Sequence, residues 1–385
     1  MHSVMRSMFG QIQPLDDIHG QFDSGYLAYA TDQALRSASA SGGALTAMLV
    51  SLLERGVIDG ALLVRPHKVQ KHAGEAFIAR TKTEILEARG SKYAITPTNV
   101  AFQEIANVPG RYAIVGLPCQ IHGFHNAAAL DRRLKERVVL TIGLLCHAVI
   151  EHDPVESVMN RLTSAEGNVT GFVYRDGKPS GIPLATLETG ERLPAFFPRT
   201  VGYQPTTIEL LNVFYRMYTP LRCLTCLDAT AELADVVFGD PWMPAPSGEI
   251  NFNDGFTYTL VRTARGASAI DEARRAAAVS LHRLREDQAR SSNVTMGREK
   301  KSRAFRLLAS RATAGLPTPN YHLRSSLPLQ RRQLRVELHL LSHWFCFRTG
   351  MRSVATKILL SRLGYLFFCL NGVRRSLRRN RASRP

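Results

Sequence analysis

Two apolar runs joined by a helix-forming segment constrain the fold of this chain more than any other feature. Residues 112–115 and 138–145 have the composition of buried strands, and residues 121–136 between them favour a helix. A strand–helix–strand unit of this length predicts two parallel, neighbouring strands. The first run is followed by Cys119 and the second by Cys146. Because parallel strands end at the same edge of their sheet, we expect both thiols at the carboxyl edge, where open α/β sheets bind ligands.

The surrounding residues extend the same alternation of strands and helices. Residues 26–30 and 58–64 favour strands on either side of an apolar helix at 44–55. Residues 157–200 are rich in turns and alternate between polar and apolar side chains, which predicts an antiparallel meander. We therefore expect an α/β fold of mixed α+β character, with a parallel-sheet βαβ core, an antiparallel insertion and a helical, basic C-terminal tail.

Shifts in composition divide the chain into five segments. Its 385 residues suffice for one large core or two modest ones. The expected segments are an irregular lead-in at 1–23, an N-terminal α/β domain at 24–108, a C-terminal α/β domain at 109–290, a polar linker at 291–327 and a basic helical tail at 328–385.

Four of the six cysteines are candidates for a metal centre. Cys119 and Cys146 are joined by the pair Cys223 and Cys226, whose C-x-x-C spacing lets two thiolates reach one centre from a single turn. Thiolates bind soft metals, and a reducing compartment makes little use of structural disulfides. The alternatives are a zinc site, a redox dithiol or simple burial of the thiols as small apolar groups. The set favours an iron–sulfur cluster, whereas Cys346 and Cys369 are explained by burial alone.

Two glycine-containing turns are candidates for binding phosphate. One is Ser41-Gly42-Gly43 at a predicted helix start, followed by Thr46, and the other is Gly90-Ser91-Lys92-Tyr93. Unobstructed N–H groups at a helix start hold phosphates, Lys92 adds a cation and Tyr93 offers an aromatic face for a flat ring. An ordinary N-cap and a surface turn explain the same residues. The sequence contains neither a G-x-G-x-x-G fingerprint nor a Walker A motif.

Polar residues near the cysteines are the remaining candidates. Asp228 and Asp240 lie close behind the C-x-x-C pair, where carboxylates orient a cofactor or tune its potential, although Asp240 also suits a turn. His147 directly follows Cys146 and is a candidate catalytic proton relay. A histidine at the end of a strand is also a common structural residue.

The net charge of +17 is concentrated in the tail. Residues 321–385 contain 14 Lys and Arg against a single Glu, whereas residues 1–320 are nearly balanced. A helix is expected at 354–370, where Lys357 and Arg362 interrupt the apolar residues. That helix is too short and too charged to span a bilayer.

Two interpretations of the tail remain open. Its apolar residues would lie in a membrane interface while the terminal arginines reach anionic headgroups, or the helices would dock on the body with a solvated end. Nucleic-acid binding is not expected, because stacking aromatics do not interleave with the terminal arginines. The N-terminus lacks an apolar signal core, so we expect the cytoplasm, with peripheral contact at the inner face of the membrane as the alternative.

The motifs together resemble a known family. In order, they are Ser41-Gly42-Gly43, Gly90-Ser91-Lys92-Tyr93, Gly116-Leu-Pro-Cys119-Gln120, Cys146-His147, Cys223-x-x-Cys226-x-Asp228 and Ala234-Asp235 running to Gly239-Asp240-Pro-Trp242. This ordered set, within residues 25–285, resembles the coenzyme F420 hydrogenase/dehydrogenase beta-subunit family, which includes 7-hydroxymethyl chlorophyll a reductase.

The resemblance implies a flavoprotein oxidoreductase with FAD and a [4Fe-4S] cluster. It assigns the four cysteines to the cluster and the Ser41 and Lys92 motifs to the flavin. Many relatives begin with a ferredoxin-like run of cysteines, but no cysteine precedes Cys119 here, so we expect a separate ferredoxin-like electron donor. The small-molecule substrate, which would exchange a hydride with FAD, is an organic compound or an F420-like carrier. The rival hypothesis is a non-enzymatic, zinc-stabilised scaffold that docks on membranes or anionic polymers through its tail.

Overall fold

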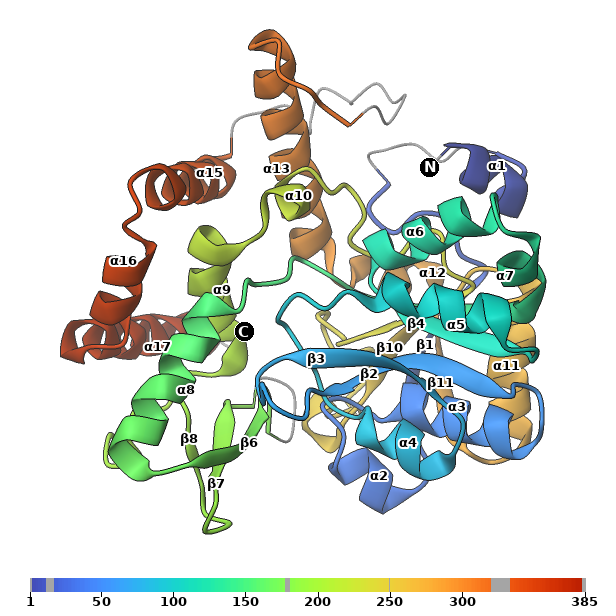
Figure 1. The fold of residues 1–385 in the computed structure, drawn as a ribbon, viewed down its shortest axis with the longest axis horizontal. Coiled ribbons are helices and arrows are strands. Elements are labelled where there is room, and N and C mark those ends of the chain that lie inside the picture. The colour runs from blue at the N-terminus through green and yellow to red at the C-terminus, as the bar shows by residue number, and fades with distance from the viewer. Residues whose placement is uncertain (1, 12–16, 177–180, 249, 320–332, 383–385) are drawn as a thin grey trace.

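A central sheet of eight strands carries the cysteine-bearing edge. The computed structural model describes residues 2–11, 17–176, 181–248, 250–319 and 333–382 (Figure 1). The strand order is β11-β1-β10-β9-β5-β4-β2-β3. The bounds are β1 Ser24–Ala30, β2 Gly60–Pro66, β3 Gly74–Ala79, β4 Tyr112–Gly116, β5 Val138–Leu144, β9 Val236–Gly239, β10 Thr257–Val261 and β11 Val279–Leu284.

Four adjacent strands are parallel, and the strands on either side of them are antiparallel. β2 pairs with β4, β4 with β5 and β5 with β9 in parallel, whereas β3, β10, β1 and β11 each run antiparallel to a neighbour. The predicted parallel unit is thus confirmed as β4 and β5, with Gly116 opposite Gly143. Successive side chains of β4 enter two different cores, Ile114 on one face and Val115 on the other, as expected of strands covered on both faces.

Helices cover both faces of this sheet. One face packs against the helices α3 Ala44–Glu54, α4 Lys82–Glu87 and α11 Ala264–Arg275, and α2 Gln33–Ser37 lies beside β1. The other carries α1 His2–Phe9, η1 Thr98–Ala101, α5 Phe102–Asn107, α6 Pro118–Ala128, α7 Arg132–Arg137 and α12 Glu286–Ser291. The short 3₁₀ helix η2 Phe252–Asp254 precedes β10.

A second lobe has its own core. Its three-stranded antiparallel sheet comprises β6 Val169–Val173, β7 Leu184–Leu187 and β8 Arg192–Pro194. Around it lie the helices α8 Asp153–Glu166 and α9 Thr207–Tyr218, and α10 Leu221–Leu224 leads back toward the body. The expected meander is correct for these strands and wrong for residues 157–166, which belong to α8 because Pro154, Val155, Val158 and Leu162 form a helical apolar face.

In the described part of the chain, four helices follow the α/β body. They are α13 Val294–Thr313, α15 Leu334–Arg348, α16 Arg352–Leu359 and α17 Arg362–Ala382. In Figure 1, α13 stands between the two lobes and α15 to α17 line the outer side of the second lobe. The inner faces of the last three helices bury Cys346 and Phe368 in the second lobe's core. The expected single helix at 354–370 is divided between α16 and α17, which bend by 67° at the break.

Two of the expected irregular segments are helical. Part of the lead-in forms α1, whose Met5 is buried in the main core. Much of the expected linker forms α13, while residues 320–327 lie outside the described residues. The buried side chains of α13 are mostly polar or charged, so the helix has no continuous apolar stripe. Hydrophobic periodicity does not reveal such a helix.

Candidate functional site

Two thiols emerge where β4 and β5 end. Cys119 lies in the first turn of α6, directly after β4, and Cys146 follows β5 by two residues. Cys146 N–H donates to Ala229 O at 2.9 Å, which ties the end of β5 to the loop that follows Cys226. The carboxyl edge of the parallel strands therefore carries both cysteines, as the sequence predicts.

The C-x-x-C pair lies beside the same edge. Cys223 is in α10, and Cys226 N–H donates back to Cys223 O at 3.3 Å, so the two follow each other in a tight turn. Burial raises the pKa of the Cys119 thiol to about 11 and that of Cys146 to about 12, and the Cys223 and Cys226 thiols nearby add to both shifts. All four groups therefore lie within electrostatic reach of one another.

The described residues show no group of three or more His, Cys, Asp and Glu side chains arranged for a single metal ion. All six cysteines are free thiols. A polynuclear cluster separates its four ligands further than a single zinc ion does, because each thiolate binds a different iron.

Helix α13 brings buried cations to this group. Lys300 Nζ donates to Cys146 O at 2.7 Å, and Arg303 lies 3.5 Å from Cys223 O. Both side chains are almost completely buried, and neither forms an ion pair with a carboxylate in the described part of the chain. Burial alone would lower the pKa of Lys300, but the surrounding thiols and Asp228 outweigh burial and raise it. Arg303 Nε has no hydrogen-bond partner among the described residues.

His147 lies against Arg303. An Arg303 terminal nitrogen is 3.4 Å from His147 Nε2, and the imidazole packs edge-on against Tyr215 at 5.4 Å. Burial and then the nearby Arg303 and Lys300 charges lower the pKa of His147 well below its usual value. The ring is therefore neutral at physiological pH. A cavity of about 20 Å³, enough for one water, separates these two residues from α15.

Asp228 organises the loop after the cysteine pair. Its carboxylate accepts from the backbone N–H groups of Thr230 and Glu232 at 3.0 and 2.9 Å. Glu232 in turn pairs with Lys301 of α13 at 2.8 Å, with both side chains buried. Asp228 thus shapes the backbone beside Cys226, and its flavin contact stays a prediction.

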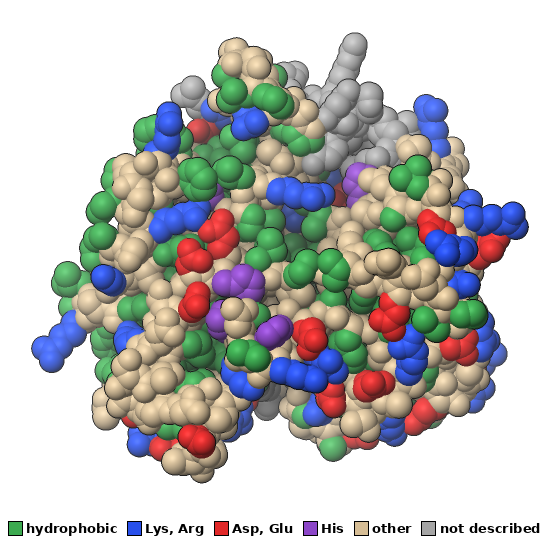
Figure 2. Space-filling model, viewed as in Figure 1, with side chains coloured by type: hydrophobic (Ala, Val, Ile, Leu, Met, Phe, Trp, Pro, Cys, Tyr) green, Lys and Arg blue, Asp and Glu red, His purple; other side chains and the backbone are tan. Residues whose placement is uncertain are grey.

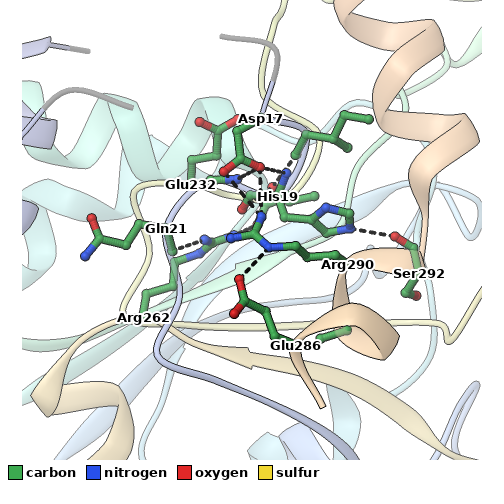
Figure 3. Close-up of polar contacts among 12 residues, drawn as sticks. Asp17, His19, Gln21, Glu232, Arg262, Glu286, Arg290 and Ser292 are labelled. Carbon is green, nitrogen blue, oxygen red and sulfur yellow. Dashed lines mark hydrogen bonds and ion pairs between the residues drawn. The ribbon is translucent and has the colours of Figure 1, made fainter. Parts of the chain in front are cut away.

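A polar network fixes the start of α13 (Figure 3). His19 Nε2 lies 2.6 Å from Ser292 O, immediately before the helix. Arg262 donates to Gln21 O at 2.5 Å and to Thr230 O at 2.9 Å, so the lead-in is also tied to the cysteine loop. These contacts hold Lys300 and Arg303 in register with the thiols.

A second group of candidates meets at Arg175. Its guanidinium forms a bidentate pair with Asp240 at 2.6 and 3.1 Å and donates to Ala40 O at 2.5 Å, next to Ser41. Burial alone would lower the pKa of Arg175, but Asp240 and then Tyr93 outweigh burial and raise it. Arg175 Nε has no partner among the described residues. Three motifs far apart in the sequence therefore converge on one buried cation.

Lys92 forms hydrogen bonds with backbone carbonyls close to it in the sequence. Its ammonium donates to three carbonyl oxygens at the end of α4, those of Ala88, Arg89 and Gly90, at 2.6 to 3.2 Å. Burial lowers the pKa of Lys92 to about 7. The neighbouring Ser91 is half-buried. Lys92 thus caps the end of α4.

The Ser41-Gly42-Gly43 turn does not form the expected open phosphate cradle. Ser41 Oγ donates to Phe256 O at 2.6 Å, and Gly42 N–H donates to Thr257 Oγ1 at 3.0 Å. A Cβ on Gly42 would lie 2.6 Å from Ala28 O, so this glycine permits close packing against the sheet. Gly43 adopts a positive φ of 72° at the cap of α3, and Thr46 is half-buried in the first turn.

A larger cavity lies away from both groups. It has a volume of about 560 Å³ and lies between the second lobe and the α16–α17 junction. Its polar lining includes Arg161, Arg199 and Arg362, and Phe197 and Tyr365 are among its apolar walls. None of the predicted site residues lines it.

Comparison with known proteins identifies the family. The N-terminal family model, described as "Coenzyme F420 hydrogenase/dehydrogenase, beta subunit N-term", matches residues 25–103. The model for the carboxyl-terminal part of the same coenzyme F420 hydrogenase/dehydrogenase protein matches residues 110–287. Proteins of this family are oxidoreductase subunits. The chain belongs to the coenzyme F420 hydrogenase/dehydrogenase beta-subunit family, as its motifs predict.

The individual relatives agree with this family. The chain is 25% identical over 299 residues to the coenzyme F420 hydrogenase subunit beta of Methanothermobacter thermautotrophicus, and the match covers 76% of this chain and 96% of that protein. It is also 25% identical over 239 residues, 58% of this chain, to 33% of the coenzyme F420-dependent sulfite reductase of Methanocaldococcus jannaschii. A chain of the F420-reducing [NiFe] hydrogenase complex from Methanosarcina barkeri shares the fold, with a TM-score of 0.62 and 21% identity, covering 81% of this chain and all of that one.

Sequence patterns alone do not reveal three central residues. Lys300 and Arg303 lie in the segment expected to be a linker, and Arg175 lies in the expected meander. The spacing of Lys300 and Arg303 places them on one face if the segment is helical, but without an apolar stripe that signal is weak. Arg175 is recognisable only once the fold brings Asp240 to it.

Proposed function

We propose that this protein is an iron–sulfur flavoprotein oxidoreductase that binds a [4Fe-4S] cluster and FAD. Cys119, Cys146, Cys223 and Cys226 would hold the cluster, and the group around Arg175 would hold the flavin. Family membership and the convergence of these residues support the assignment. Coenzyme F420 is one candidate for the hydride carrier.

One observation carries the cluster assignment. Two buried cations, Lys300 and Arg303, donate to the backbone carbonyls of Cys146 and Cys223 and lie within electrostatic reach of the thiols, and neither forms an ion pair with a carboxylate in the described part of the chain. A buried charge is costly unless it is compensated. A [4Fe-4S] centre with four thiolate ligands carries net negative charge, which the two cations would balance. The donor set and the charges therefore fit this group.

The surroundings of Arg175 fit an anionic, aromatic ligand. Arg175 is buried with an unpartnered Nε, Tyr93 lies within reach of it, and Lys92 supplies a second cation nearby in sequence. A flavin needs a cationic contact for its diphosphate and a flat face for its ring. Asp240 would keep Arg175 oriented through its bidentate pair. Ser41 and Gly42 would support this group by holding the Ala40 carbonyl in place.

Some of these residues would bind the cofactors, and others would balance charge or orient their neighbours. When bound, the cluster supplies single-electron transfer and FAD converts between single electrons and a hydride. The four cysteines would bind the cluster, Lys300 and Arg303 would balance its charge, and the burial of Cys146, Lys300 and Arg303 would exclude water from that side. His147 would orient Arg303 through the contact at its Nε2, and its role as a catalytic proton relay stays a proposal.

The partners follow from this division. We propose a ferredoxin-like donor for the single electrons and a small organic substrate or an F420-like carrier for the hydride. The relatives of this chain include an F420 hydrogenase subunit and an F420-dependent sulfite reductase, which supports an F420-type carrier. A cytoplasmic location is part of the same proposal, because both partners are soluble there.

The zinc-stabilised scaffold has less support. No group of His, Cys, Asp and Glu side chains among the described residues is arranged to hold a single metal ion. Structural zinc also draws its ligands from compact knuckles, whereas two of these thiols follow separate strands.

Anaerobic purification tests the proposal. We expect a brown protein with flavin bands, about four irons per chain and acid-labile sulfide. Cys223→Ala should lose the iron, whereas Cys346→Ala should keep it, because Cys346 packs in the second lobe. Arg175→Met should lose flavin while keeping iron. A colourless protein with one zinc, or equal iron in both cysteine variants, would contradict the assignment.

A further inference from the structure

The last three helices concentrate the exposed apolar side chains of the chain. Among the described residues, 24 large hydrophobic side chains are exposed, and 14 of these lie between residues 334 and 373. About a tenth of the chain thus carries more than half of them. They are Leu334, Leu338, Leu341, Trp344, Phe345, Phe347, Met351, Val354, Ile358, Leu363, Leu366, Phe367, Leu370 and Val373.

These side chains form the outward face of docked helices. Val336, Cys346 and Phe368 on the inward side are buried, and Tyr218 Oη bonds Thr356 Oγ1 at 2.6 Å. Apolar side chains therefore collect along the outer edge formed by α15 to α17 (Figures 1 and 2). A contiguous apolar face of this kind is unusual on a monomer and typically marks an interaction surface.

The charges on the same helices are almost all positive. Arg335, Arg348, Lys357 and Arg362 are exposed among the apolar residues. The one acidic residue of this region, Glu337, pairs with Arg306 of α13 at 2.8 Å. Six more arginines follow between residues 374 and 384 in the sequence. The surface thus complements an anionic one.

We infer that the outward face of α15–α17 docks on an anionic lipid bilayer. Apolar side chains combined with lysine and arginine are the pattern of interfacial helices, and each basic residue near an anionic membrane adds up to about 1 kcal/mol. Trp344 and the exposed phenylalanines suit the headgroup boundary. In the described residues no single helix is long and apolar enough to cross a membrane. α16 and α17 reach that length and apolar composition only together, and they are bent by 67° at the break between them.

Vesicle sedimentation of the full-length protein tests this inference. We expect binding to vesicles with a third phosphatidylglycerol, much weaker binding to pure phosphatidylcholine, and release by high salt. Leu366→Glu/Leu370→Glu should reduce the bound fraction severalfold. Leu130→Glu is the matched control, because Leu130 is 92% exposed on the α/β body. It should leave binding unchanged.

Three results would overturn the inference. They are no binding to the anionic vesicles, equal loss of binding in both variants, and a dimer of the free protein that Leu366→Glu/Leu370→Glu dissociates. The last result would assign the face to a second copy of the chain. A face covered by a different protein would appear as absent vesicle binding.

A separate observation carries a second inference, which rests on the proposed cluster. Lys300 and Arg303 come from α13, beyond residue 287, where the family match ends. We propose that these positioning residues set the reduction potential of the cluster. Reduction adds one negative charge to the centre, and two fixed cations stabilise the reduced form more than the oxidised one. Their presence therefore raises the potential.

An EPR-monitored redox titration tests the role of Lys300. Lys300→Met should lower the midpoint potential, and Lys300→Arg should restore most of it. Arg298→Met is the control, because Arg298 is exposed on the same helix. An unchanged potential in Lys300→Met with full iron content would refute this inference and leave the proposed function intact. Absence of iron from the unmodified protein would refute the proposed function instead.

Discussion

The α/β body and the C-terminal helices are built by different rules. The body, up to about residue 287, buries strands and helices through regular apolar patterns, and both family matches lie within it. The C-terminal helices bury lysine and arginine on α13 and expose apolar residues on α15 to α17. They reverse the usual distribution of polar and apolar side chains.

This contrast indicates that the two regions have different partners. The body buries most of its apolar side chains internally, and the proposed cysteine and Arg175 sites lie on it. The C-terminal helices carry the buried cations beside the proposed cluster and the exposed apolar face that we infer docks on a bilayer. Four tests follow from this contrast.

The largest change is expected where the two regions are joined by a buried ion pair. Lys301 and Glu232 are 0% and 2% exposed at their side chains. Removing one partner leaves an uncompensated buried charge, so Lys301→Met should lower the free energy of unfolding by about 3–5 kcal/mol. Chemical denaturation measures this loss. The double variant Lys301→Met/Glu232→Met should recover most of it, and no recovery would mean that packing rather than charge causes the loss.

Two neighbouring phenylalanines test whether the last helix is docked. Phe368 is 3% exposed and packs on Phe197, whereas Phe367 is 46% exposed. Phe368→Ala should cost about 3 kcal/mol of unfolding free energy, because it empties a buried site. Phe367→Ala should stay within about 0.5 kcal/mol. Equal effects of the two substitutions would show that α17 is not held by this face.

We expect Lys92, which lies in the α/β body, to make the folding stability depend on pH. Burial lowers its pKa from 10.5 to about 7, so the unfolded chain binds more protons than the folded chain between these values. The stability of the cofactor-free protein should therefore rise with pH across this window. Lys92→Met should flatten the rise in a series of denaturation curves. A rise of the same slope in the variant would assign the effect to other groups.

The sequence predicts the body well for a physical reason. The side chains of strands such as β4 and β5 alternate between two buried faces of the sheet. Because the two strands are parallel, the cysteines that follow them lie at the same edge. Both the fold and the meeting of Cys119 with Cys146 follow from local patterns. The Ser41 turn is harder to interpret, because its hydroxyl and amide bond to residues some 215 positions away.

The remainder of the site depends on partners that a local pattern does not contain. Lys300 is an ordinary surface residue by sequence, and only the fold brings Cys146 O to it. Arg175 likewise meets Asp240 across 65 residues. Burial of a charged side chain is decided by such distant partners, so hydrophobic periodicity does not predict it.

The smallest change is expected at the exposed contact between α13 and α15. Arg306 and Glu337 form an ion pair at 2.8 Å, with side chains 28% and 36% exposed. Such pairs contribute at most about 1 kcal/mol, because water screens them and both side chains lose freedom. Glu337→Gln should therefore change the unfolding free energy by less than this amount, and the difference should vanish in high salt. The same substitution removes the one acidic residue beside the outward apolar face, so it should also strengthen vesicle binding slightly. A large, salt-independent loss of stability would instead mean that the contact behaves like the buried Lys301–Glu232 pair.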